Sequence, residues 1–249
     1  MKSESRIATT WAARGGRCDT NGNIQMRKYT AAAALFAALA IGAPAQAEDM
    51  QGKVQVKLLA TGVLPDGELK SVNVDGLGVP AGTDTEANDN YVPTLAIEYF
   101  FTNNLSVETI CCVTQHDVDA NAGPLSGAEL VGDATIIPAT FTLKYHFGDH
   151  STVTPYVGAG PSFFWVVSDK PGAGVVGLGG IDDFKLDNAF GVALQAGVDI
   201  PLGGVSLSLD AKKYFISTDA HWFAGSTEML ATEHKLDPWV VSVGAGISF

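Results

Sequence analysis

The chain has 249 residues, 46% of them hydrophobic, and a formal net charge of −12 at pH 7. Residues 1–47 hold six of its 15 basic and two of its 27 acidic residues, so residues 48–249 carry nine lysines, 25 acidic residues and no arginine. Binding along nucleic-acid phosphates needs clustered lysine and arginine, so nucleic acid is excluded as a partner.

Residues 26–47 have the pattern of a secretory signal peptide. Arg27 and Lys28 precede an apolar run over residues 31–43, and the small residues Ala45 and Ala47 follow it. The run is too short to cross a bilayer as a helix, which takes about 20 residues. We expect cleavage near Ala47, an exported domain over residues 48–249, and a mis-called N-terminal extension over residues 1–25.

Eight later segments have the composition of strands. The connections between them alternate between short turns and long polar stretches, which is typical of an outer-membrane barrel with short periplasmic turns and long extracellular loops. The expected strands are residues 53–64, 91–101, 105–114, 137–147, 152–167, 187–200, 204–216 and 238–249. The long connections are residues 65–90, 115–136, 168–186 and 217–237.

The last segment shows the strongest alternation. Every second residue is apolar, which places these side chains on one face of a strand. Ten steps of about 3.3 Å, tilted by about 40°, rise roughly 25 Å, the height of the apolar band of an outer-membrane barrel. The face predicted to contact lipid is Trp239, Val241, Val243, Ala245, Ile247 and Phe249.

Two other strands separate into faces in the same way. In residues 190–200, Leu194 faces outward and Gln195 inward, and in residues 139–147 Phe141 faces outward and Lys144 inward. Lys213 breaks the pattern, and either an ammonium that reaches the lipid head groups or a bulge explains it. The sequence therefore predicts an all-β protein, an eight-stranded antiparallel transmembrane β-barrel in the bacterial outer membrane.

Five stretches resemble the OmpW family of outer-membrane proteins. They are residues 94–108 (TLAIEYFFTNNLSVE), 138–147 (PATFTLKYHF), 155–160 (PYVGAG), 190–199 (FGVALQAGVD) and 236–240 (LDPWV), in the family's order. The resemblance covers most of residues 48–249. It implies an eight-stranded barrel that forms a narrow channel for small hydrophobic molecules, with alkane-uptake proteins among its relatives.

The inward faces divide into two groups by height. An eight-stranded barrel has an interior that side chains nearly fill, so its lining determines what passes. Near the short turns we expect a polar plug made of Glu98, Glu108, Lys144, His146, Gln195, Asp199 and Asp210. Nearer the long loops we expect a hydrophobic lining made of Ile110, Phe164, Val166, Ile216 and Val240, which either forms a path for an apolar solute or only packs together.

A hydrophobic solute blocked below by this plug would leave sideways through the wall. Proline has no N–H and interrupts strand pairing. Pro93, Pro138 and Pro161 all lie in or beside predicted strands. The resemblance to the OmpW family is the main ground for expecting lateral release into the membrane at one of them; the alternative is that each proline lies at a rim position and has no such role.

Two other functions compete with transport. A lipid-modifying enzyme needs a paired Ser and His, and the sequence offers neither a G-x-S-x-G motif nor such a pair at the outer rim, so no catalytic residue and no cofactor are expected. His116, His221 and His234 stand near acidic residues without recognised metal-ligand spacing, so they are predicted to be solvated loop residues and no metal site is expected. Adjacent Cys111 and Cys112 point to opposite faces and are read as small apolar fillers.

The remaining alternative is a structural or surface-interaction barrel that transports nothing. Its long acidic loops would meet lipopolysaccharide, phage or toxin. The partners expected for either kind of barrel are outer-membrane lipid and lipopolysaccharide, together with the barrel-assembly machinery, which would bind the C-terminal strand. A transporting barrel would also bind small hydrophobic solutes.

Overall fold

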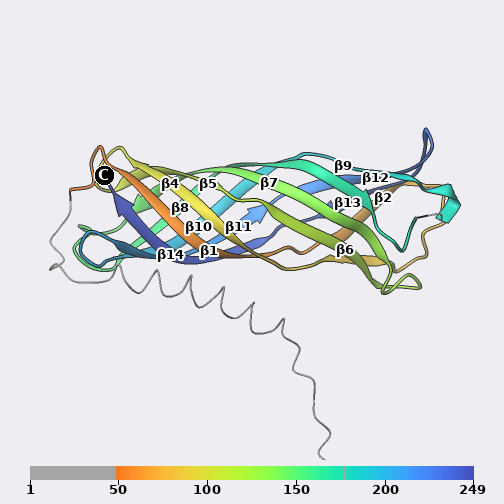
Figure 1. Cartoon of the computed structure of the whole chain (residues 1–249), viewed down its shortest axis with the longest axis horizontal. Coiled ribbons are helices and arrows are strands. Elements are labelled where there is room, and N and C mark those ends of the chain that lie inside the picture. The colour runs from red at the N-terminus through yellow and green to blue at the C-terminus, as the bar shows by residue number, and fades with distance from the viewer. Residues whose placement is uncertain (1–48, 177) are drawn as a thin grey trace, which may run out of the picture. The chain divides into compact units, whose positions relative to one another are not determined.

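The computed structural model describes residues 49–176 and 178–249. The expected N-terminal extension and signal peptide lie outside the described residues. Eight antiparallel strands close into a barrel, which confirms the predicted fold class (Figure 1). In their order around the wall they are β1 (Val54–Leu64), β14 (Trp239–Ser248), β11 (Ser206–Phe215), β10 (Ala189–Pro201), β8 (Thr154–Pro171), β7 (Glu129–His146), β5 (Leu105–Cys111) and β4 (Asn90–Phe100).

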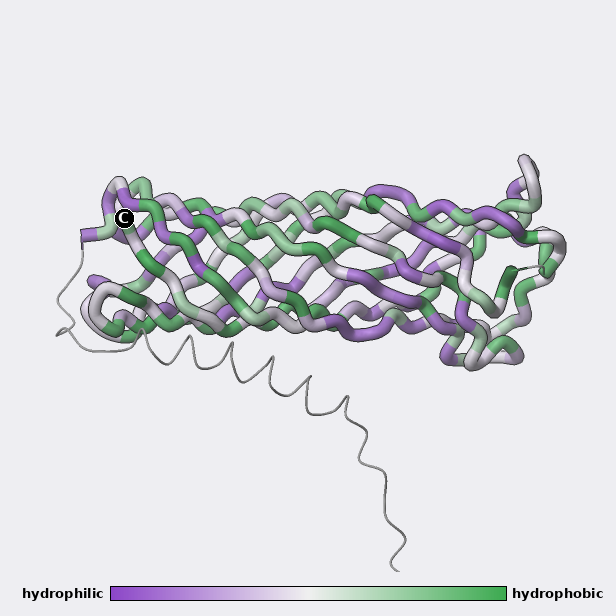
Figure 2. Tube along the Cα trace, viewed as in Figure 1, coloured by the Kyte–Doolittle hydropathy of each residue, from purple (hydrophilic) through white to green (hydrophobic). Residues whose placement is uncertain are grey.

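The first and last strands of the barrel pair with each other. Gln55 to Leu64 of β1 lie opposite Ser248 to Trp239 of β14 without a register shift. Exposed and buried residues alternate along both strands, because successive side chains of a strand point to opposite faces. The same alternation is visible as the change between apolar and polar colour along the strands (Figure 2).

The four long connections follow the membrane strands as predicted, but they contain further strands that the sequence analysis did not predict. They contain β2 (Glu68–Asp75), β3 (Asp84–Ala87), β6 (Thr114–Ala122), β9 (Asp183–Leu186), β12 (Ser217–Ala224) and β13 (Thr227–Lys235), besides a short 3-10 turn η1 (Leu178–Gly180) and the outer parts of β7 and β8. In β12, the buried Thr218, Ala220 and Trp222 alternate with residues that are partly exposed. The buried face begins with the polar Thr218, so the apolar contrast that marks a strand is weak in the sequence.

These extra strands continue the barrel beyond the membrane. One four-stranded sheet has the order β2, β13, β12, β9, and β3 and β6 continue the wall beside β7. They lie at the end of the barrel opposite the C-terminus (Figure 1). An apolar core fills the space between them, with Trp222, Phe184, Ile181, Leu130 and Val175 buried at its centre.

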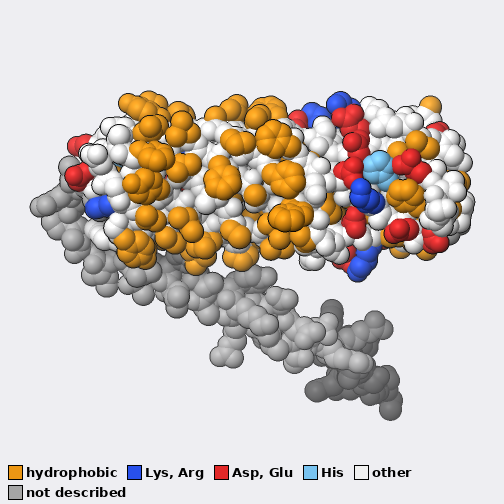
Figure 3. Space-filling view, turned by 90° about the horizontal axis from the view of Figure 1, so that it is seen from above, with side chains coloured by type: hydrophobic (Ala, Val, Ile, Leu, Met, Phe, Trp, Pro, Cys, Tyr) orange, Lys and Arg blue, Asp and Glu red, His pale blue; other side chains and the backbone are white. Residues whose placement is uncertain are grey.

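On the face seen in Figure 3, a broad apolar band is bordered on the extracellular side by a belt of charged side chains. Exposed apolar side chains such as Leu58, Leu194 and Val243 lie on other strands of the wall as well. Exposed aromatic residues lie near both edges of the band, as expected for a barrel that spans a bilayer. Toward the short turns they are Tyr99, Phe101, Tyr145, Phe147 and Phe249, and toward the long connections they are Tyr91, Trp165, Phe190, Phe215 and Trp239. No helix of the described residues is long and apolar enough to cross a membrane.

Lys213 keeps its outward position without a bulge. Its pairing with Leu194 on one side and Trp239 on the other belongs to an unbroken register. Its ammonium donates a hydrogen bond to the carbonyl oxygen of Asp237 and lies 5.4 Å from the centre of the Trp239 ring. The cation is thus held at the outer edge of the band by a backbone acceptor and an aromatic face.

Candidate functional site: the barrel interior

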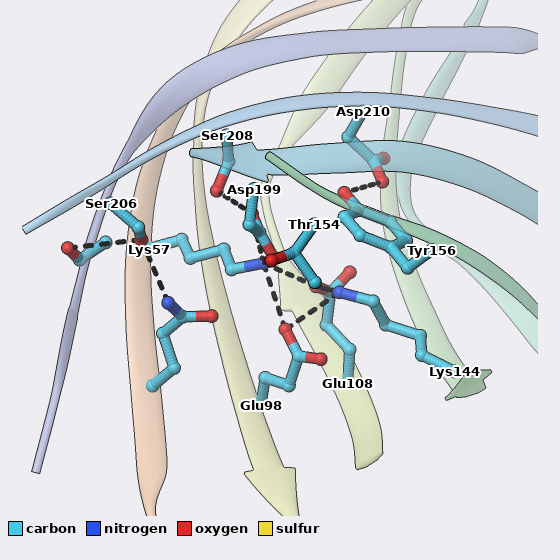
Figure 4. A network of polar contacts seen from close by, with 12 residues as sticks. Lys57, Glu98, Glu108, Lys144, Thr154, Tyr156, Asp199, Ser206, Ser208 and Asp210 are labelled. Atoms are coloured by element: carbon cyan, nitrogen blue, oxygen red, sulfur yellow. Dashed lines mark hydrogen bonds and ion pairs between the residues drawn. The ribbon is translucent and has the colours of Figure 1, made fainter. Parts of the chain in front are cut away.

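The periplasmic half of the lumen is closed by a network of buried charges (Figure 4). Lys57 Nζ lies 2.9 Å from Glu98 Oε2 and 3.0 Å from Asp199 Oδ2, and Lys144 Nζ lies 2.8 Å from both Glu98 Oε2 and Glu108 Oε2. All five side chains are buried. Buried charges need partners with good geometry, and here each lysine bridges carboxylates from different strands.

Uncharged groups complete this network. Gln195 Nε2 donates to Glu108 Oε1 at 2.9 Å and to Asp210 Oδ2 at 2.6 Å, and the Tyr156 hydroxyl donates to Asp210 Oδ2 at 2.8 Å. The Lys144 ammonium lies 3.8 Å from the centre of the Tyr156 ring. The structure thus brings together all seven residues predicted for the polar plug, and we call this network, with Lys57, Lys212 and Tyr156, the plug.

Three important members of the plug were missed by the sequence analysis. Lys57 lies within the apolar run of β1, and Lys212 is followed directly by the outward Lys213, so neither stands out as a lumen cation. Assigning every second residue of each strand to the lumen would have identified both lysines. Lys57 lies on the inward row of β1 with Leu59, and Lys212 lies on the inward row of β11 with Asp210. Tyr156 was not predicted as a lumen residue, because many other aromatic residues of the strands face lipid.

One contact within the plug has the composition of a catalytic triad but not its geometry. His146 Nε2 lies 3.0 Å from Ser106 Oγ and 2.7 Å from Glu98 Oε1, so the serine and the acid share one ring nitrogen. A triad needs the serine at one nitrogen and the acid at the other. His146 Nδ1 has no hydrogen-bond partner among the described residues, and all three side chains are fully buried. The contact therefore reads as part of the plug.

An elongated apolar cavity lies above the plug. It comprises about 1010 Å³, counting the part open to solvent. Among the residues predicted as the hydrophobic lining, Ile110, Phe164 and Val240 border it directly. Ile216 is buried in the same apolar cluster as Phe164 and Val240, and Val166 packs against that cluster. The other apolar groups at its wall include Leu59, Val63, Ala134, Ile136, Leu186 and Leu236.

Two histidines that were predicted to be solvated are instead buried at the extracellular end of this cavity. His116 contacts the carbonyl oxygen of Asn88 at 2.7 Å through Nδ1 and Thr114 Oγ1 at 2.8 Å through Nε2. His234 lies between Thr85 Oγ1 and Thr232 Oγ1. Burial lowers the pKa of both rings below the usual value, because a charged imidazole would lose its hydration.

The remaining histidine and the two cysteines singled out in the sequence make no unusual contacts. His221 is partly exposed and contacts Glu228 Oε1 at 2.6 Å. Within the described part of the chain, no three His, Cys, Asp or Glu side chains are arranged to hold a metal ion. Cys111 and Cys112 are free thiols, the first exposed on the outer face and the second buried at the cavity wall.

A closed antiparallel barrel with an external apolar band and a filled polar interior defines the chain as an outer-membrane β-barrel protein. The model of the OmpW family matches residues 50–249, so the chain belongs to the OmpW family. This confirms the resemblance seen in the sequence.

Curated relatives agree with this assignment. The chain is 34% identical to the uncharacterized outer-membrane protein y4mB of Sinorhizobium fredii, over 78% of each chain. It is 31% identical to outer membrane protein W of Vibrio cholerae, over 67% of this chain and 77% of that one. It is 28% identical to the dibenzothiophene metabolism operon protein PahQ of Pseudomonas aeruginosa, over 84% of this chain and 93% of that one.

Solved structures show the same fold. OprG of Pseudomonas aeruginosa superposes with a TM-score of 0.70 at 24% identity, over 82% of this chain and 98% of that one. AlkL, a protein of Ectopseudomonas oleovorans, superposes with a TM-score of 0.64 at 24% identity, over 84% of this chain and 96% of that one.

Proposed function

We propose that this barrel is a narrow passage for small hydrophobic molecules across the outer leaflet region. The observation that carries the proposal is the apolar cavity directly above the plug. A water-filled pore would have a polar lining along its whole length, whereas here apolar side chains dominate the outer half. Such a lining favours an apolar guest, because contact with it removes apolar surface from water.

One relative's name supports the same class of cargo. PahQ is described as a protein of a dibenzothiophene metabolism operon, and dibenzothiophene is an apolar aromatic molecule. A barrel that admits such a compound to the cell would need a route that is not filled with water. The cavity offers this kind of route as far as the plug.

Lateral release is the exit that we propose, because the plug blocks the axis. The strand pairing around Cys112 and Val113 is interrupted: β5 pairs with β7 only as far as Ile110, and pairing resumes at Thr114 of β6. On the other side, the pairing of β4 with β5 ends at Leu95 and Cys111. We call residues 112–113 and the prolines that flank them the seam.

Both flanking strands carry a proline at the seam. Continuing the two registers places Pro93 opposite Val113 and Pro138 opposite Cys112. Proline cannot donate a backbone hydrogen bond, so each flanking strand lacks one N–H donor at this point. Cys112 and Pro138 also border the cavity, which supports an exit at this point. Pro161, the third proline considered, pairs with Val192 in the continuous register of β8 with β10 and lies away from the seam.

The experiment that tests the passage compares uptake by a deletion strain that carries either the parent gene or a variant. Phe164→Asp places an unpaired carboxylate in the cavity, so we expect uptake of a radiolabelled alkane to fall at least about tenfold, which corresponds to 1.4 kcal/mol or more against an apolar guest. Ser168→Asp, on the exposed face of the same strand, is the matched control. Unchanged uptake in a correctly assembled Phe164→Asp barrel would favour the structural alternative.

The charged belt favours contact with lipopolysaccharide as the second candidate function. It includes the pairs Lys70 with Glu233, Lys170 with Asp133, and Lys185 with Asp187, all at the surface beyond the apolar band. Carboxylates at this height would meet phosphate groups through divalent cations. The structural barrel predicts that deletion weakens the envelope without changing hydrophobic uptake.

The last part of the proposal concerns how the chain is exported and inserted into the membrane. We infer that the signal peptide of residues 26–47 is removed near Ala47, and that the barrel-assembly machinery binds β14. The outward side chains of β14 support this, since Trp239, Val243 and Phe249 form an exposed apolar row that ends at the C-terminus. Sequencing the N-terminus of the purified protein tests the cleavage site.

A further inference from the structure

The floor of the cavity differs chemically from its walls. Among the residues that border the cavity, Lys212 is the one with a formal charge, while Lys57, Lys144 and the carboxylates of the plug lie below it. Lys212 follows Asp210 on the inward row of β11, so it lies one inward step above Asp210, at the top of the plug. Lys212 therefore borders an apolar space that no acidic side chain borders.

The ammonium of Lys212 has a donor to spare. Its Nζ lies 2.6 Å from Asp210 Oδ1 and 3.1 Å from Glu108 Oε1, and these are its two hydrogen-bond acceptors among the described residues. An ammonium group has three N–H donors. The third has no acceptor among the described residues, and the side chain is only 2% exposed.

Thr94 gives an independent indication of the same kind. It borders the same cavity from the inward row of β4, two inward steps above Glu98, and is 2% exposed. Among the described residues its Oγ1 makes no hydrogen bond of good geometry, and its polar neighbour is the thiol of Cys112, a weak partner. A buried hydroxyl without a strong partner is costly, so a bound acceptor would relieve both Thr94 and Lys212.

Charge balance decides which acceptor fits. The plug holds four carboxylates (Glu98, Glu108, Asp199 and Asp210) and three ammonium groups (Lys57, Lys144 and Lys212). It has no surplus positive charge to compensate an anionic head group that has lost its water. A neutral oxygen acceptor can take the spare hydrogen bond without adding a charge.

We propose that the floor is a head-group subsite, and that the preferred guest is an apolar chain with one uncharged terminal oxygen acceptor, such as a ketone or an ester. Its oxygen accepts hydrogen bonds from Lys212 and Thr94, while its chain lies along Ile110, Phe164 and Val240. This inference rests on the proposed function and narrows its substrate class from any hydrophobic solute to a mono-oxygenated one.

The test measures binding in lipid nanodiscs that contain the full barrel, with nonane, 2-nonanone and nonanoate at pH 8 as probes. Methyl NMR signals of Ile110 and Val240 report each dissociation constant. We expect 2-nonanone to bind most tightly. Thr94→Val should weaken 2-nonanone about fivefold, as for one lost hydrogen bond, and leave nonane unchanged. Thr114→Val is the matched control, since Thr114 borders the cavity but already pairs with His116.

A second variant addresses Lys212 without leaving an unpaired carboxylate. Combining Lys212→Met with Asp210→Asn removes one charge of each sign, and it should abolish the preference for 2-nonanone over nonane. Equal binding of 2-nonanone and nonane to the parent barrel would overturn the subsite and leave the hydrophobic passage intact. Tighter binding of nonanoate would overturn the neutral head group, and no binding of any probe would overturn the passage as well.

Discussion

Lys57 and Asp199 meet across the lumen at 3.0 Å, although 142 positions separate them in the chain and two strands separate them in the wall. The same ammonium reaches Glu98 at 2.9 Å. These contacts tie β1 to β10 and to β4 through the interior, so the plug fastens the barrel as well as closing it. Fastening the barrel and closing its lumen predict different consequences when a residue of the plug is substituted.

Removing the cation should destabilise the barrel strongly. Lys57→Met leaves Glu98 and Asp199 without one of their partners, and breaking a buried ion pair in this way costs about 3–5 kcal/mol. Urea unfolding of the detergent-refolded barrel, followed by the heat-dependent shift of its gel band, measures the loss. Lys213→Met is the control at the outer face, where we expect less than about 1 kcal/mol. Similar losses at both positions would contradict a fastening role for the plug.

Depth in the membrane should set the cost of a cation on the outer face. Leu194 is 52% exposed near the middle of β10, and Phe190 is 71% exposed at its extracellular end. Leu194→Arg should cost roughly 2–4 kcal/mol, and Phe190→Arg roughly 0–1 kcal/mol for the charge, because the penalty falls toward the interface. Unfolding titrations in lipid vesicles compare the two. Equal penalties would mean that the membrane does not sit on the apolar band as inferred.

Acid should loosen the extracellular sheet. Burial lowers the pKa of His234 and His116 in the fold, so below the ordinary value of about 6.5 the unfolded segment binds protons more readily than the folded one. The neutral, buried histidines therefore contribute their full stability above that pH, and this contribution is lost as the pH falls from it through the lower pKa of the folded state. Hydrogen exchange of residues 217–235, corrected for its intrinsic pH dependence, should therefore be faster at pH 5.5 than at 7.5.

The matched variant separates this effect from general acid loosening. His234→Gln keeps a side chain that can contact Thr85 and Thr232 but does not titrate. Its exchange should change less between the two pH values than that of the parent. An equal change in both proteins would assign the acid effect to other groups.

The sequence predicts the wall of this barrel better than its interior contacts or its extracellular end. Lipid makes one face of each strand apolar, so residues such as Leu194 and Phe141 reveal the eight membrane strands through period-2 alternation. The contrast is weaker in β12 and β13, because the polar residues Thr218 and Thr232 lie on the buried side. The sequence also could not predict which carboxylates contact Lys57, because strand tilt decides which distant residues meet across the lumen.

The seam offers a switchable test of lateral release. Thr94 lies opposite Cys112 when the register of β4 with β5 is continued, and directly opposed residues of antiparallel strands have Cα atoms about 4.5–5.5 Å apart, within the range of a disulfide. In a Cys111→Ser background, Thr94→Cys should therefore form a cross-strand disulfide with Cys112 on oxidation. The bond would hold β4 to the irregular segment, residues 112–113, and keep this side of the seam closed.

We expect oxidation to lower alkane uptake severalfold and reduction to restore it, measured in the same cells. The Cys111→Ser strain with native Thr94 is the control and should not respond. Uptake that is equal in the oxidised and reduced states, with the bond verified by mass spectrometry, would exclude an exit on the β4 side of the seam.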